Sequence, residues 1–86
     1  MYKYTIARQL ATKRVITNRG DEVGKLIDLL VNERTGEIEK LLVELDKESK
    51  IVRRINAKDK MIEISYSAVT AVSDVFIVDE RELLSR

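Results

Sequence analysis

Any chemistry in this chain has to come from carboxylates, lysines, arginines and hydroxyls, because its 86 residues contain no His and no Cys. His is the usual acid–base group near neutral pH, and His and Cys are the common ligands of transition metals. No nucleophile can be paired with a base here unless a Lys serves as that base. These residue types favour a binding module over an enzyme, and we expect no catalytic residue, no metal and no cofactor.

Two short motifs bring candidate reactive groups together, and each has a simpler structural explanation. Ser65 and Ser67 flank Tyr66, but we expect the hydroxyls to cap a turn rather than to attack a substrate. Residues 20–24 begin and end with Gly. This segment lacks the Gly-Lys-Ser/Thr ending of a phosphate-binding loop and lies between two expected strands.

The charged motifs have similar alternatives. The adjacent acids at 21–22 could attract a divalent cation, but acids in a turn are usually solvated. Asp79 and Glu80 suit the start of a helix better than a general acid and base. The adjacent arginines at 53–54 are the most distinctive charged feature. We keep Arg53 and Arg54 as possible partner contacts, with a solvated loop as the favoured alternative.

Charge is distributed unevenly along the chain. The first twenty residues hold five bases and no acid, so the rest carries −4 against a total of +1. A basic end can contact phosphate or an acidic partner, although a solvated surface is the simpler interpretation. The aromatic residues are not interleaved with the bases as a stacking platform for nucleic acid requires; they are Tyr2, Tyr4, Tyr66 and Phe76.

Length and composition predict one domain over residues 1–86, with 44% hydrophobic and 36% charged residues. A chain this short buries a small fraction of its surface, and association with a second copy is one way to add burial. It contains no apolar run long enough to cross a membrane. No apolar secretory core follows the first residues, so we expect no signal peptide and a cytoplasmic location.

The pattern of apolar residues and turns predicts a mainly β fold. Strands at 23–32 and 37–46, joined by the Thr-Gly turn at 35–36, form the most secure hairpin. Asn and Gly at 18–21 indicate a tight turn, and Gly24 indicates a bulge or a close approach of backbones. Shorter strands are expected at 15–16, 61–64 and 75–78.

Helical structure is expected only in short turns, at 5–11, 65–69 and 80–85, the last capped by Asp79. The basic segment 47–60 is expected to be a loop that apolar residues pin to the core, or a short strand. About six short strands with tight turns predict a small β-barrel or sandwich.

The two long strands carry more large aliphatic residues than one interior can hide. Because successive strand residues face opposite ways, we expect the core face to hold Ile27, Leu29 and Val31 of one strand and Leu41, Val43 and Leu45 of the other. A register error of one residue would exchange the faces. Four aliphatic residues then need a second cover: Leu26, Leu30, Ile38 and Leu42.

A symmetric homodimer would provide that cover, and we expect Leu30, Leu42 and Phe76 to mediate self-association. The alternative is that the termini fold back over the same residues.

Several segments together resemble the PRC-barrel domain family, over nearly the whole chain. They are the Ile-Ala-Arg-Gln-Leu run at 6–10, residues 13–16, Gly20, 23–24, 28–31, 35–37, 41–43, 64–69 and 72–75. The resemblance implies a small PRC-type β-barrel with short helical turns near the termini. Its motifs are mostly structural, so they specify the fold far better than the function.

The relatives implied by this resemblance use the barrel to dock proteins and not for catalysis. The chain is most similar to small stand-alone archaeal members, some of them implicated in cell division. The resemblance therefore implies a non-catalytic adaptor that binds a SepF-like division protein or a second PRC-barrel protein, recruited to the division site.

Two other functions stay open. One is a ribosome- or RNA-associated maturation factor resembling the C-terminal domain of RimM, which would use the basic segments and bind in a salt-dependent way. The other, a small-molecule or metal sensor inside the barrel, is the poorer fit, because so small a barrel is filled by its own side chains.

Overall fold

The computed structural model describes residues 13–55 and 59–85, together with the backbone of residues 2–4. The fold is mainly β, as predicted, with short helical segments late in the chain. The strands are β1 (Tyr2–Tyr4), β2 (Arg14–Thr17), β3 (Glu22–Asn32), β4 (Ile38–Leu45), β5 (Met61–Ser65), β6 (Val69–Val72) and β7 (Phe76–Val78). The helices are α2 (Lys50–Ile55), the 3-10 turn η1 (Tyr66–Ala68) and α3 (Glu80–Leu84).

All seven strands belong to one sheet, with the order β5-β4-β3-β2-β7-β6 and with β1 paired to β3. The pairs are antiparallel except for β2 with β7. Strand β3 is the spine of the sheet, because β4 follows one of its edges while β2 and β1 occupy the two ends of the other. Within the described residues this path does not close, since β5 and β6 are its two ends.

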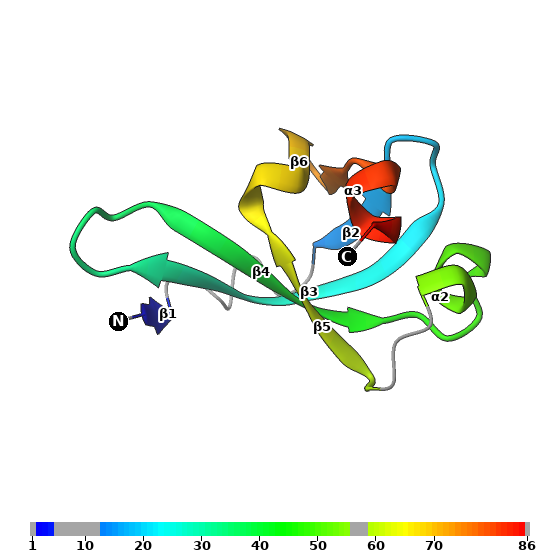
Figure 1. Ribbon diagram of the computed structural model, residues 1–86, viewed down its shortest axis with the longest axis horizontal. Helices are drawn as coiled ribbons and strands as arrows, with labels where there is room; N and C mark the ends of the chain where they lie inside the picture. Colours follow the sequence, from blue (N-terminus) through cyan, green and yellow to red (C-terminus); the bar gives the residue numbers. More distant parts are fainter. Residues whose placement is uncertain (1, 5–12, 56–58, 86) are drawn as a thin grey trace.

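The β3–β4 hairpin extends from the rest of the molecule and forms one end of its long axis, with α2 at the opposite end (Figure 1). Leu41, Val43 and Leu45 of β4 are buried on the inner face, as predicted. The tight turns that the sequence indicated before β3 and before β4 contain Gly20 and Gly36, with φ of 87° and 76°. Positive φ is readily adopted only by Gly, so these turns depend on it.

The register of this hairpin shifts at two points, and the first of them alters the faces expected for β3. Leu26 pairs with Val43 and Asp28 pairs with Leu42, so Ile27 is an extra residue that resets the alternation of side chains. Leu26 is therefore fully buried beside Leu29, and its predicted need for a second cover was wrong. Ile27 is left half-buried rather than in the core.

Gly24 marks a close approach of two backbones, one of the two roles predicted for it. It pairs with Leu45 of β4 and with Val15 of β2. A Cβ atom at this position would overlap the backbone carbonyl oxygen of Glu44. Only Gly fits here, because the obstacle is backbone and cannot rotate away.

The core lies in the concave side of the sheet, and both helices help to fill it. Ile51 of α2 and Leu83 of α3 are fully buried and belong to the same core cluster as the strand residues. Segment 47–60 was expected to be a loop or a strand, but residues 50–55 form a helix. The spacing of Ile51 and Ile55, four residues apart, puts both on one helical face, and that apolar stripe decides the structure.

None of the helices in the described ranges is long and apolar enough to cross a membrane. The expected helical turn at 5–11 lies outside the described residues. Asp79 caps α3 as predicted, because its Oδ1 accepts a hydrogen bond from the backbone N–H of Arg81 at 2.9 Å.

Candidate interaction surfaces

A surface groove between β5, η1 and α3 brings Ser65 and Ser67 together with Lys40. The two serine hydroxyl oxygens are 2.9 Å apart, and Lys40 lies across the β4–β5 pair from Ser65. Lys40 is the lysine among the residues that line this groove, and its ammonium forms an ion pair with Glu63 at 3.2 Å. A neighbouring carboxylate favours the charged form of a lysine. This pairing therefore disfavours Lys40 as a base for either serine.

The three residues predicted for self-association differ in how far the structure buries them. Phe76 of β7 is only 3% exposed and belongs to the core cluster. It has no surface to offer a second copy, so we drop it from the interface. Leu30 is 9% exposed but is not part of that cluster. Leu42 is half-buried.

Leu42 lies on the outer face of the sheet together with two other apolar residues. Its cross-strand neighbours are Asp28 on β3 and Glu63 on β5. The bulge residue Ile27 precedes Asp28, and Met61 stands two residues before Glu63 on the same face of β5. Met61 is 45% exposed. We call Ile27, Leu42 and Met61 the outer apolar face.

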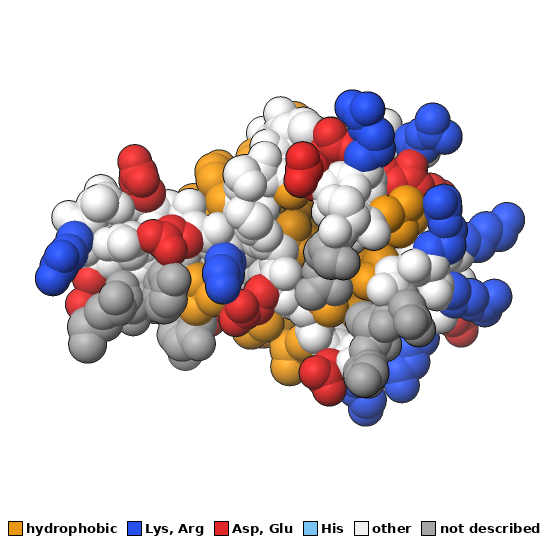
Figure 2. All heavy atoms as spheres, viewed as in Figure 1, with side chains coloured by type: hydrophobic (Ala, Val, Ile, Leu, Met, Phe, Trp, Pro, Cys, Tyr) orange, Lys and Arg blue, Asp and Glu red, His pale blue; other side chains and the backbone are white. Residues whose placement is uncertain are grey.

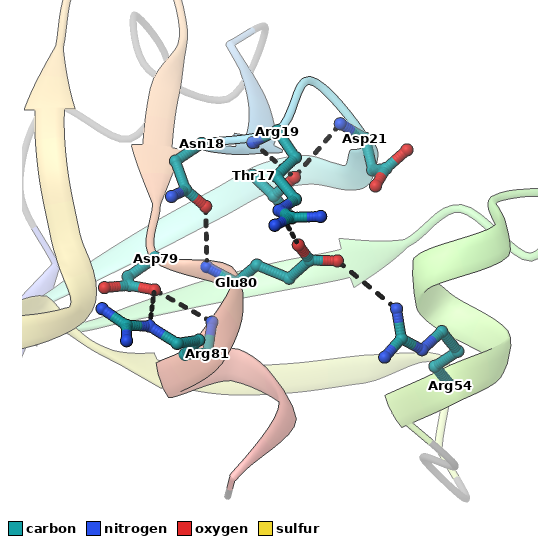
Figure 3. Close-up of polar contacts among 8 residues, drawn as sticks. All are labelled: Thr17, Asn18, Arg19, Asp21, Arg54, Asp79, Glu80 and Arg81. Carbon is teal, nitrogen blue, oxygen red and sulfur yellow. Dashed lines mark hydrogen bonds and ion pairs between the residues drawn. The ribbon is translucent and has the colours of Figure 1, made fainter.

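A second feature lies at the α2 end, where one carboxylate joins three segments that are distant in the sequence (Figure 3). Glu80 of α3 forms an ion pair with Arg19 Nε at 3.3 Å and another with Arg54 Nη1 at 3.6 Å. Its side chain is 11% exposed, against 78% for Arg19 and 64% for Arg54. The acid is thus an internal anchor, and the two guanidinium groups lie at the surface.

The turn that presents Arg19 is built by a buried hydroxyl. Thr17 Oγ1 accepts hydrogen bonds from the backbone N–H groups of Arg19 at 3.2 Å and Asp21 at 3.1 Å. The backbone of the same residue accepts from Gly20 and donates to Asp21. Thr17 is 1% exposed, so its polar atoms are satisfied inside the turn rather than by water.

The same turn is fastened to the start of α3. Asn18 Oδ1 accepts from the backbone N–H of Glu80 at 3.0 Å, and the backbone N–H of Asn18 donates to Val78 at 2.9 Å. Two of the first N–H groups of α3 are therefore bound, one by Asn18 and one by Asp79. The turn that carries Arg19 and the start of α3 that carries Glu80 are consequently fastened to each other.

Arg53 and Arg54, the predicted partner contacts, differ in their surroundings. Arg54 is engaged with Glu80, whereas the exposed Arg53 side chain has no ion pair or hydrogen bond with a described residue. Neither Glu80 nor Arg19 was predicted as part of a site. The acidic start of α3 was visible in the sequence, but its partners come from segments that only the fold brings together.

Comparison with known proteins identifies the fold. The model of the PRC-barrel domain family matches residues 6–84. An uncharacterized protein of the archaeon Methanocaldococcus jannaschii is 32% identical over 77 residues, which cover 90% of this chain and 83% of that protein. The family model covers nearly the full length, and the chain belongs to the PRC-barrel family.

Proposed function

We propose that this chain is a non-catalytic protein–protein interaction module that acts as a homodimer. The observation that carries the proposal is the outer apolar face, where Ile27, Leu42 and Met61 lie on the side of the sheet opposite the core. The face crosses three adjacent strands, and the charged Asp28 and Glu63 lie directly across from Leu42 within it. Apolar side chains that gather on the outer side of a sheet typically mark interaction sites.

A second copy is the occupant that suits this face best. A chain of 86 residues buries a smaller fraction of its surface than a larger domain does. Most homodimers have twofold symmetry, in which the same patch of each copy meets the other. The Lys40–Glu63 ion pair lies beside Leu42 on β4 and β5, so the apolar centre has the charged rim that is typical of a protein interface.

The more specific form of the proposal follows the resemblance to stand-alone archaeal PRC-barrel proteins. In this form the dimer is a cytoplasmic adaptor of the cell-division machinery. It links a SepF-like membrane anchor, or a second PRC-barrel protein, to the division site. The fold and the apolar face support a docking role, and the family resemblance supports this choice of process.

Solution mass at micromolar concentration tests the dimer. We expect sedimentation equilibrium to give twice the chain mass. Leu42→Ala should weaken the dimer by about 1 kcal/mol or more, as truncation of a well-packed interface residue does. Val72→Ala is the control, because Val72 is an aliphatic residue, 48% exposed, on β6 at the other end of the strand order.

A monomeric wild-type chain at this concentration would exclude the dimer. An unchanged dimer constant for Leu42→Ala would place the interface elsewhere on the molecule.

A further inference from the structure

The helix α2 presents only positive charge to solvent. Its six residues include Lys50, Arg53 and Arg54 and no acid. Residues three and four apart share one face of a helix, so these three bases lie together, opposite the face that buries Ile51. Arg19 is linked to the same region through Glu80. We call Arg19, Lys50, Arg53 and Arg54 the basic surface.

Two of these arginines are ordered before any partner arrives. Glu80 holds Arg19 and Arg54 from beneath through the ion pairs at 3.3 and 3.6 Å. Each of these contacts uses only one nitrogen, and a guanidinium has five N–H donors. The remaining donors of exposed side chains can bind an incoming carboxylate, and ordering in advance reduces the entropy lost on binding.

Charge is also polarised along the molecule, whose longest extent is 36 Å. The tip of the β3–β4 hairpin, residues 33–39, has three acids and one base. Figure 2 shows Lys and Arg side chains gathered at the opposite end, around α2. A ligand attracted by charge is therefore directed to α2 and away from the hairpin tip.

Features around the basic surface favour separate carboxylates over a nucleic-acid backbone. The exposed or half-exposed acids Asp46 and Glu48 stand just before α2, and Asp59 follows it. A phosphodiester chain, with a charge on every unit, would meet these acids. No exposed aromatic side chain of the described residues lies on α2 to stack a base. A peptide can space its acids to match the arginines one by one.

We propose that the basic surface binds an acidic segment of a partner protein, with Glu80 as the positioning residue beneath it. The inference rests on the proposed role as an interaction module and supplies the chemistry of its partner. The acidic segment would bind at the end of the molecule formed by α2, whereas the second copy would bind at the outer apolar face. Failure of one can therefore be distinguished from failure of the other.

The test is fluorescence anisotropy with the full-length chain and a labelled ten-residue peptide of alternating Glu and Gly at about 50 mM salt, where charge contacts are weakly screened. Arg53→Glu should weaken binding about fivefold, because an exposed charge contact is lost and a repulsion is added. Arg34→Glu is the matched control, with the same change of charge at the hairpin tip. Arg34 has no ion pair with a described residue, and we expect a change below about twofold.

Four outcomes would overturn the proposal. One is equal weakening by the two variants, or no binding of the peptide by the wild type. Another is tighter binding of a decauridylate RNA than of the peptide, which would make a nucleic acid the ligand. The last is salt-sensitive polymerisation of the wild type alone, abolished by Arg53→Glu, which would make the hairpin tip of a second copy the occupant. Sedimentation of the same samples shows whether the dimer is intact, so loss of peptide binding by an intact dimer counts only against the acidic partner.

Discussion

Glu80 joins three segments of the chain that are distant in the sequence. Its backbone N–H is bound by Asn18 and its carboxylate by Arg19 and Arg54. A carboxylate that is mostly removed from water needs such partners, since an unpaired charge there would be costly. The partners are themselves exposed, which limits the free energy that each ion pair contributes.

Glu80→Gln tests this linkage. We expect the free energy of unfolding to fall by about 1–2 kcal/mol, because the amide keeps the shape of the side chain but loses both ion pairs. The loss should be smaller in an Arg54→Gln background, which a double-mutant cycle in urea measures. Glu82→Gln, at an exposed acid of the same helix, is the control and should change stability by less than about 0.5 kcal/mol. An additive cycle would show that the Arg54 contact contributes nothing.

Gly24→Ala should destabilise the fold for a purely steric reason. The added methyl group would overlap the carbonyl oxygen of Glu44 across the β3–β4 pair, so one strand has to shift. Overpacking of this kind costs about 1–3 kcal/mol. Lys25→Ala, at the exposed neighbouring position, should stay within about 0.5 kcal/mol of the wild type. Equal urea midpoints for the two variants would show that the strands separate at this point without penalty.

Single residues were predictable where their role is local. The N-cap at Asp79 and the close approach at Gly24 follow from residue type and position, and both are confirmed. The contacts of Glu80 were not predictable, because they depend on the packing of α2 beside α3. Residues 75–78 are apolar on both faces, so the sequence placed Phe76 at an interface. Only the pairing of β7 between β2 and β6 shows that the Phe76 side is buried.

Helix α2 is too short to be stable by itself. It has six residues, far fewer than the roughly 12–15 that an isolated helix needs for marginal stability. The fully buried Ile51 holds it to the core, and the Arg54–Glu80 ion pair holds its outer face. Helices with few attachments open without unfolding of the whole domain. The basic surface is thus carried by an element whose position depends on very few contacts.

Native-state hydrogen exchange should reveal this difference. We expect the amides of α2 to exchange faster than those of β3 and β4, because α2 opens locally while the central strands require global unfolding. In Glu80→Gln the exchange of α2 should accelerate more than that of β4. Uniform acceleration across all elements would show that α2 opens only with the whole domain.

The β3–β4 hairpin was the most predictable element because alternation and turn residues agree along its length, as β4 shows with its buried Leu41 and Val43. Its bulges were not predictable, because one extra residue leaves the hydrophobic pattern of a doubly apolar strand unchanged. Segment 47–60 was misassigned for the opposite reason. The many charges of this segment conceal the apolar stripe of a helix, formed by Ile51, Val52 and Ile55.

For the whole molecule, two proposed surfaces of different chemistry are carried by different parts of the chain. The outer apolar face lies on β3, β4 and β5, and the basic surface lies on α2 and the turn after β2. A partner held at α2 therefore does not have to displace a second copy held on the sheet. Such an arrangement suits an adaptor, because it allows a dimer to carry two partners at once.

The two surfaces should respond differently to salt. Between about 50 and 500 mM, the affinity for the acidic peptide should fall at least tenfold, because exposed charge contacts are screened. The dimer constant should change by less than about twofold, since apolar burial depends little on moderate salt. Sedimentation measures the dimer constant, and anisotropy measures the affinity for the peptide. Leu42→Ala should alter only the dimer constant, and Arg53→Glu should alter only the affinity for the peptide. A parallel fall of both with salt would mean that charge, rather than the outer apolar face, holds the copies together, and the basic surface would then belong to the dimer interface.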